Sequence, residues 1–198
     1  MMAGFGIALE AARERWSTPA QRAFASMVML GIASLSYPEP MSAQESRIDP
    51  AWVSFDTTVR AARFQLIAGL TGLNGALNFN GFRDGELTLV LPVGWKTEID
   101  FRNHDGMLSH SAEVISSQTP VPSQSVDPAI PRAFTVKLDS GLPPEATDQM
   151  RFTAEPPGEY LIFCGVPGHG LGGMWIRLRV SATATTPGLV LTPAQGPS

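Results

Sequence analysis

Apolar and polar side chains alternate along much of the chain, and this pattern predicts short β-strands. In the clearest case, residues 174–180, every second residue is apolar while Arg177 and Arg179 lie between them. A period of two places the apolar side chains on one buried face of a strand. Further runs of this kind occupy 52–56, 62–68, 77–81, 86–91, 96–102, 109–115, 134–137, 150–153 and 160–164.

The segments between these runs are rich in Gly, Pro, Asn and Asp, which is typical of turns. After residue 45 no segment shows the period of a long helix. Parallel neighbouring strands usually need a helical crossover, so the absence of helices favours antiparallel pairing. We therefore expect an all-β fold, an antiparallel sandwich or barrel.

The two ends of the chain differ from this body in composition. Residues 1–44 combine early arginines, an apolar run at 23–35 and a proline-containing exit, as an export signal does. The apolar run is shorter than the roughly 20 residues that span a bilayer, and both cleavage and retention as an N-terminal membrane anchor stay open. We expect a periplasmic or outer-face location, a folded domain at 45–181 and a flexible Pro/Thr/Ala-rich tail at 182–198.

Charge and cysteine content exclude several classes of protein. The chain has 14 basic and 18 acidic residues, a net charge of −4. Nucleic-acid binding therefore has no electrostatic support. The single cysteine, Cys164, excludes an internal disulfide and any metal site that needs two thiolates.

Three soft metal ligands lie on one short loop between the last two predicted strands. Cys164, His169 and Met174 are separated by a Gly/Pro-rich sequence. A lone cysteine or methionine is often only a core residue, but three such groups in one loop favour a metal site. Thiolate and thioether ligands select copper, whereas zinc rarely uses a thioether.

A site of this kind needs a second imidazole, and the chain has three histidines. His110 lies in the alternating run 109–115, in phase with apolar neighbours. His104 lies in an Asn-His-Asp-Gly turn, where a solvated side chain is the ordinary outcome. We therefore expect His110 to be the fourth ligand.

Three segments resemble the sulfocyanins, a branch of the blue-copper (cupredoxin) family close to rusticyanin. They are Asn-Phe-Asn-Gly at 78–81, His-Ser at 110–111, and Cys-Gly-Val-Pro-Gly-His at 164–169 followed by Gly-Met-Trp at 173–175. Gly170 and Leu171 depart from the usual residues at those positions, and the leader resembles a signal rather than the membrane anchor of archaeal sulfocyanins. The resemblance implies a cupredoxin-like Greek-key sandwich and one type 1 copper.

In such a site Cys164, His110 and His169 would form the ligand plane, with Met174 as the weak axial ligand. We expect backbone N–H groups of Ser111 and Val166 to donate to the Cys164 sulfur, and Asn80 to support the site from its own segment. Ser111, where many blue-copper proteins have Asn, resembles the high-potential relatives. A high reduction potential is therefore a hypothesis.

The function implied is one-electron transfer. His169 would be the electron port, because Pro167 and Leu171 beside it carry no charge and permit short-lived docking. By resemblance the partners would be respiratory, with a cytochrome c or bc-type donor and a terminal oxidase, and we expect a monomer.

Three rival functions are weaker. A copper enzyme would need a second metal centre, and at most one histidine remains after the first is built. A copper carrier or chaperone, the main alternative, would need an open cluster of Met and His residues, whereas Met174 stands alone before a strand. A sandwich without metal leaves the ligand loop unexplained. We expect a protein that is not an enzyme.

Overall fold

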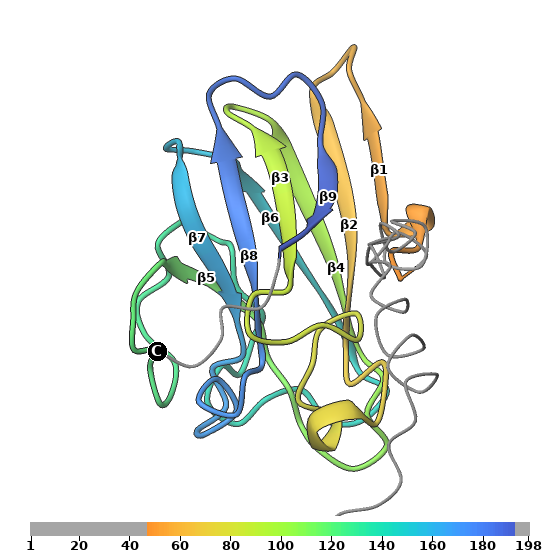
Figure 1. The fold of residues 1–198 in the computed structure, drawn as a ribbon, viewed down its shortest axis with the longest axis vertical. Coiled ribbons are helices and arrows are strands. Elements are labelled where there is room, and N and C mark those ends of the chain that lie inside the picture. The colour runs from red at the N-terminus through yellow and green to blue at the C-terminus, as the bar shows by residue number, and fades with distance from the viewer. Residues whose placement is uncertain (1–46, 193–198) are drawn as a thin grey trace, which may run out of the picture. The chain divides into compact units, whose positions relative to one another are not determined.

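The computed structural model describes residues 47–192, and strands dominate them (Figure 1). The strands are β1 (Val53–Asp56), β2 (Ala61–Ala68), β3 (Leu87–Pro92), β4 (Lys96–Asn103), β5 (Glu113–Ser116), β6 (Thr147–Thr153), β7 (Gly158–Phe163), β8 (Trp175–Ser181) and β9 (Gly188–Leu191), with short 3-10 turns η2 (Pro50–Trp52) and η3 (Leu73–Ala76). The predicted export signal or anchor at 1–44 lies outside the described residues. Among residues 47–192 no helix is long and apolar enough to cross a membrane.

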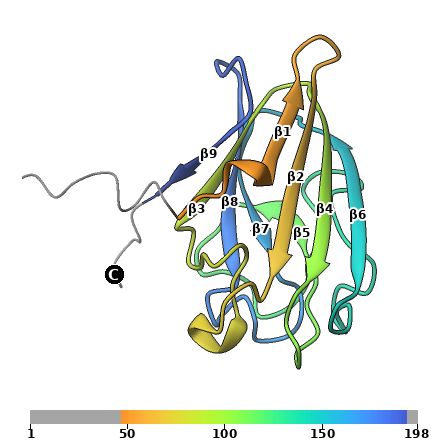
Figure 2. The same ribbon diagram turned by 90° about the vertical axis from the view of Figure 1, so that its right-hand side faces the viewer.

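The strands form two packed layers, and in Figure 2 β1, β2, β4 and β6 lie to the right of β9, β3 and β8. One sheet has the order β1-β2-β4-β6 and the other the order β5-β7-β8-β3-β9. In β2 and β4 buried and more exposed side chains alternate, because only one face of each strand meets the opposite layer. The predicted all-β sandwich is confirmed.

Both sheets are mixed, so the expectation of purely antiparallel pairing is wrong for two pairs. β2 runs parallel to β4, with Leu66 opposite Phe101. β3 runs parallel to β8, with Leu89 opposite Leu178. The chain between β2 and β4 passes through β3 in the other sheet, so a strand of the opposite layer makes the crossover that a helix makes elsewhere.

The core between the layers is apolar and continuous. Its largest fully buried side chains are Phe64, Phe79, Phe82, Phe101, Phe163, Leu66, Leu87, Leu89, Leu91, Ile99, Ile115 and Ile130. Each side chain of this size stabilises the fold by about 1.5–3 kcal/mol. A core of this kind gives the loops at the ends of the strands a rigid base.

The prediction of a flexible tail at 182–198 is wrong for the central part of that segment. Gly188–Leu191 forms β9, which pairs antiparallel with β3. The Oγ1 atoms of Thr88 and Thr192 lie 2.6 Å apart and close this edge. Four apolar or small residues between Pro- and Thr-rich segments are too short a run for the alternation to stand out. Residues 193–198 lie outside the described part.

Three other predicted strands are shorter than expected or absent. The run 77–81 forms no strand and pairs only through isolated bridges at Phe79. The run 109–115 becomes β5 from Glu113 only, and His110 forms an isolated bridge with Leu142. The run 134–137 makes a single bridge, from Phe134 to Glu113. The connection between β5 and β6 covers this edge irregularly and takes up the backbone groups that a strand would use.

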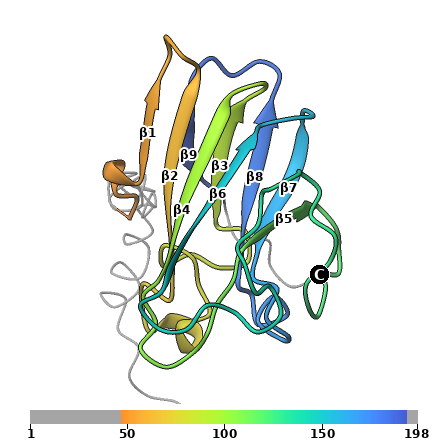
Figure 3. The same ribbon diagram turned by 180° about the vertical axis from the view of Figure 1, so that it is seen from behind.

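The connections β2–β3, β4–β5 and β7–β8 all lie at the same end of the sandwich, with η3 (Figures 1 and 3). The β1–β2 turn lies at the opposite end. The candidate ligands therefore come to one end from different layers.

Candidate metal centre

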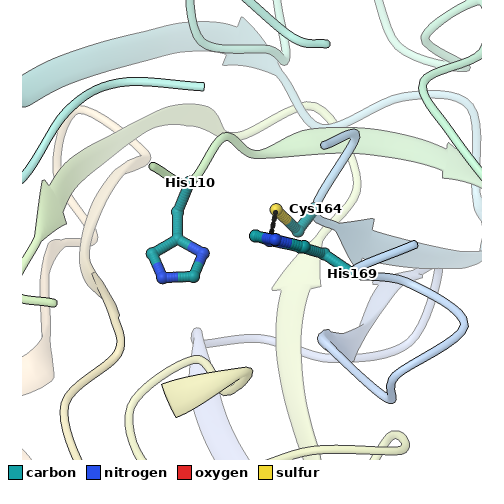
Figure 4. A group of neighbouring side chains, drawn as sticks. All are labelled: His110, Cys164 and His169. Atoms are coloured by element: carbon teal, nitrogen blue, oxygen red, sulfur yellow. Dashed lines mark hydrogen bonds between the residues drawn. The ribbon is translucent and has the colours of Figure 1, made fainter. Parts of the chain in front are cut away.

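Three of the predicted ligands come together at this end of the sandwich. One donor atom from each of His110, Cys164 and His169 lies within 4.8 Å of the others. Figure 4 shows the three side chains, with Cys164 Sγ 3.5 Å from His169 Nδ1. The ring centroids of His110 and His169 are 5.1 Å apart. His104 is not part of this group: its side chain is 45% exposed and lies 3.9 Å from Glu145.

The ligand loop is closed by its own backbone. Cys164 N–H donates to Met174 C=O at 3.1 Å, and Met174 N–H donates to His169 C=O at 3.0 Å. A Cβ at Gly170 would lie 1.9 Å from the Phe163 ring, so only glycine allows the loop to pack against β7. Gly170 is thus needed because the loop passes close to the Phe163 ring.

Met174 is fully buried directly before β8. Its two backbone bonds place it between the other two ligands of the loop. This position agrees with an axial ligand, and that role stays a prediction.

Cys164 is a free, buried thiol. Burial raises its pKa to about 11, and the charge of Glu113 acts in the same direction, while the amides of Ser111 and Val166 lower it. The Ser111 amide lies 3.5 Å from the sulfur, as predicted. The Ser111 hydroxyl donates to Leu138 C=O at 2.7 Å and accepts from the Gly165 amide at 3.1 Å. Ser111 therefore connects the segment that carries His110 with the loop that carries Cys164.

His110 presents a buried ring nitrogen that could bind a metal ion. Its Nε2 lies 2.9 Å from Asp105 Oδ2, and its buried Nδ1 has no hydrogen-bond partner among the described residues. Burial lowers the pKa of His110, although Asp105 raises it. The imidazole is therefore neutral, and since a carboxylate can only accept, Nε2 carries the hydrogen and Nδ1 offers a lone pair.

Asp105 stays ionised in this setting. Burial raises its pKa, but the hydrogen bond from His110 and those from the Met107 and Leu108 amides outweigh it, so the pKa is lowered overall. The arrangement of carboxylate and histidine behind a ligand nitrogen is common at metal sites. The role of Asp105 could not be predicted, because residues 103–106 have the sequence of an ordinary turn.

His169 is partly exposed, and its unprotonated form is favoured. Burial, followed by the charge of His110, lowers its pKa to about 4. The neighbouring Pro167 is exposed and Leu171 is 60% exposed. The loop between β7 and β8 supplies a thiol, a neutral imidazole and a buried thioether, and His110 supplies a second neutral imidazole. Together they are the donor set of a type 1 copper centre.

The side chain of Asn80 bonds to the backbone of β2. Its Oδ1 accepts from Ile67 N–H at 3.0 Å and its Nδ2 donates to Gln65 C=O at 2.9 Å. Asn80 therefore secures a strand edge, and its support of the ligands stays a prediction. Asn74 donates a hydrogen bond from its side chain to Gly172 C=O in the ligand loop. This contact could not be predicted, since nothing in the sequence connects Asn74 with that loop.

The chain is similar to several known proteins. A model of the sulfocyanin (SoxE) domain matches residues 52–191. The sulfocyanin of Sulfolobus acidocaldarius is 31% identical over 121 residues, which are 58% of this chain and 60% of that protein. A methionine-to-glutamine variant of rusticyanin superposes with a TM-score of 0.52 at 18% identity, covering 71% of this chain and 92% of that chain. Reduced auracyanin from Roseiflexus castenholzii gives a TM-score of 0.44 at 19% identity, covering 60% and 96%.

Proposed function

Because the chain belongs to the sulfocyanin family, we propose that it transfers single electrons through one type 1 copper ion. His110, Cys164 and His169 would hold the ion together with the buried thioether of Met174. When bound, copper supplies a one-electron Cu(I)/Cu(II) couple. The observation that carries the proposal is the buried Nδ1 of His110, which has no other partner in residues 47–192 and belongs to the His110–Cys164–His169 group.

The protein's own contribution is a donor set that changes little between oxidation states. Cys164 and Met174 are held by the loop's backbone bonds, and His110 by a buried hydrogen bond. His169 reaches the surface from the same loop, so it would be the electron port, and Pro167 and Leu171 would form its uncharged surround. This arrangement suits transfer to a partner that binds briefly.

We extend the proposal to partners and location. A cytochrome c or bc-type protein would donate electrons and a terminal oxidase would accept them, outside the cytoplasm. Support comes from the family, from the export-like sequence at 1–44 and from the apolar surface at Leu171. The same reasoning gives a monomer that is not an enzyme.

A copper carrier of the same fold is the alternative, and its site would have to release the ion readily. Here Cys164, His110 and Met174 are all fully buried. Burial favours retention, and the rate of copper loss to a chelator distinguishes the two functions.

The proposal is tested by adding one equivalent of Cu(II) to the full chain and recording the visible spectrum. An intense blue band from thiolate-to-copper charge transfer is expected, and Cys164→Ser and His110→Ala should abolish it. His104→Ala is the matched control, since its side chain is exposed, and it should keep the band. A colourless protein that loses copper quickly would support the carrier, and one that binds no copper would overturn both functions.

A further inference from the structure

We propose that Asp105 is a positioning residue that fixes the His110 tautomer and, through its buried negative charge, lowers the reduction potential of the centre. This inference rests on the proposed copper function. The effect of Asp105 on the potential is opposite in sign to the one expected from Ser111. Ser111 contacts Cys164, whereas Asp105 contacts His110.

The Asp105 carboxylate is held in one orientation. Its Oδ1 accepts from Met107 N–H at 2.8 Å and from Leu108 N–H at 3.2 Å. Its own N–H donates to Asn103 Oδ1 at 3.0 Å. The Asn103 side chain in turn donates to Leu108 and Leu142 carbonyl oxygens, each at 2.9 Å. With Oδ1 occupied by the turn, Oδ2 is the oxygen that faces His110.

Packing prevents Asp105 from moving away from the imidazole. The end of β2 lies against it, and a Cβ at Gly69 would be 2.7 Å from Asp105 Cβ. Gly69 has a φ of +65°, which favours glycine independently of that contact. The close approach leaves no room for the Asp105 backbone and Cβ to shift toward Gly69.

His110 is fixed from its other side. Its backbone exchanges two hydrogen bonds with Leu142, at 3.1 and 2.7 Å. A Cβ at Gly141 would lie 2.8 Å from His110 N, so the covering loop also packs tightly. The ring is fully buried, and its hydrogen bond to Asp105 directs Nδ1 toward the other donors.

The charge has a thermodynamic consequence. A carboxylate bonded to the remote nitrogen raises the basicity of an imidazole ligand. A nearby negative charge stabilises the ion with the higher positive charge, because Coulomb attraction grows with charge. Asp105 should therefore favour Cu(II) over Cu(I), which is a lower potential.

Two variants of the full chain separate position from charge. Asp105→Asn removes the charge and keeps one oxygen, which accepts from Nε2 only if it gives up the Met107 and Leu108 amides, and the His110 tautomer of this variant shows whether it does. We expect Cu(II) affinity to fall about 10- to 100-fold, with Cu(I) affinity little changed. At 59 mV per tenfold change for one electron, the potential rises by about 60–120 mV. Asp105→Ala removes the acceptor, and His110 in the copper-free protein should then populate both tautomers.

Tautomers are read from the ring ¹⁵N shifts of copper-free protein by long-range ¹H–¹⁵N correlation, so this readout does not depend on copper binding. Asp139→Asn is the control, because it removes one exposed carboxylate that bonds Ser125 beside the ligand loop. It should leave the tautomer unchanged and move the potential much less.

Wild-type His110 protonated at Nδ1, or equal shifts in potential for Asp105→Asn and Asp139→Asn, would overturn the inference. An Nε2–H tautomer in a protein that forms no blue copper centre would instead overturn the proposed function and leave the positioning role of Asp105 intact. Backbone ¹H–¹⁵N spectra of each variant establish that it is folded before either readout is taken.

Discussion

Asn74 Nδ2 donates a hydrogen bond to the carbonyl oxygen of Gly172 at 2.5 Å, although the two residues are 98 positions apart. The same Nδ2 lies 3.2 Å from Leu77 C=O. A second bond nearby, from Asp84 N–H to Gly173 C=O at 2.9 Å, joins the same two segments. The β2–β3 connection therefore holds the ligand loop from outside.

Removing the Asn74 side chain should loosen that loop. Asn74 has a φ of 56°, so Asn74→Gly removes the hydrogen bonds without straining the backbone. We expect the free energy of unfolding to fall by about 1–2 kcal/mol and copper loss to a chelator to become faster. Thermal unfolding and the rate of bleaching of the blue band measure these effects.

Leu73→Ala is the control for this change, because Leu73 lies in the same 3-10 turn and is 61% exposed. If Asn74→Gly bleaches no faster than Leu73→Ala, the loop does not depend on the Asn74 bond.

Copper binding at pH 7 should release one proton. The Cys164 pKa of about 11 means that the thiol is protonated in the copper-free protein, whereas a His169 pKa of about 4 means a neutral imidazole. The His110 pKa is also lowered. Only the thiol then has a proton to lose when the metal binds.

Titration calorimetry in buffers of different ionisation enthalpy counts this proton. Binding to Cys164→Ser, if any remains, should release none. Two protons from the wild-type protein would show that a histidine is protonated in the copper-free form.

The local parts of the site could be predicted from the sequence. Cys164, His169 and Met174 lie close together along the chain, and the alternation around them defines the two strands that carry the loop. His110 could be chosen over His104 because its neighbours alternate in phase with a core. These inferences need only neighbouring residues.

The parts that depend on distant pairing could not be predicted. Alternation shows which face of a strand is buried and says nothing about its partner, so the parallel pairs β2–β4 and β3–β8 were missed. The contacts of Asp105 and Asn74 arise only when separate turns meet. Asn80 belongs to a segment that resembles the family, yet its side chain bonds to β2.

Glu113 should make the stability of the copper-free protein depend on pH. Its Oε1 lies 3.3 Å from Val126 N, and its buried Oε2 has no partner within residues 47–192. Burial raises its pKa from 4.5 to about 7; Asp139 and Asp127 add to this and the Val126 amide opposes it. Between these two values the folded state binds more protons than the unfolded state.

The free energy of unfolding should therefore fall as pH rises from about 4.5 to 7, and the cost should stay constant above that. Glu113→Gln removes this titration, so relative to wild type it should gain about 3 kcal/mol by pH 8, because Glu113 is fully buried. Urea unfolding at pH 4.5, 6 and 8 compares the two proteins. If the difference in the free energy of unfolding between the two proteins is the same at all three pH values, the pKa of Glu113 is not raised in the folded protein.

The surface beside His169 should determine how fast electrons reach the centre. Leu171 is 60% exposed on the ligand loop. A carboxylate at this position would lose its water when an apolar partner surface docks, and a buried unpaired charge opposes association. Leu171→Asp should slow the bimolecular reaction with a soluble cytochrome c about tenfold, equivalent to about 1.4 kcal/mol, and leave the copper spectrum unchanged.

Val59→Asp is the matched control for Leu171→Asp. Val59 is also 60% exposed, and it lies in the β1–β2 turn at the opposite end of the sandwich (Figure 1). Both variants add the same charge to the protein. Salt screens the long-range part of its effect, so a difference between the variants that persists at high ionic strength reports local docking. Stopped-flow traces at two ionic strengths measure the difference. Equal rates for the two variants would show that electrons do not pass through the surface at Leu171.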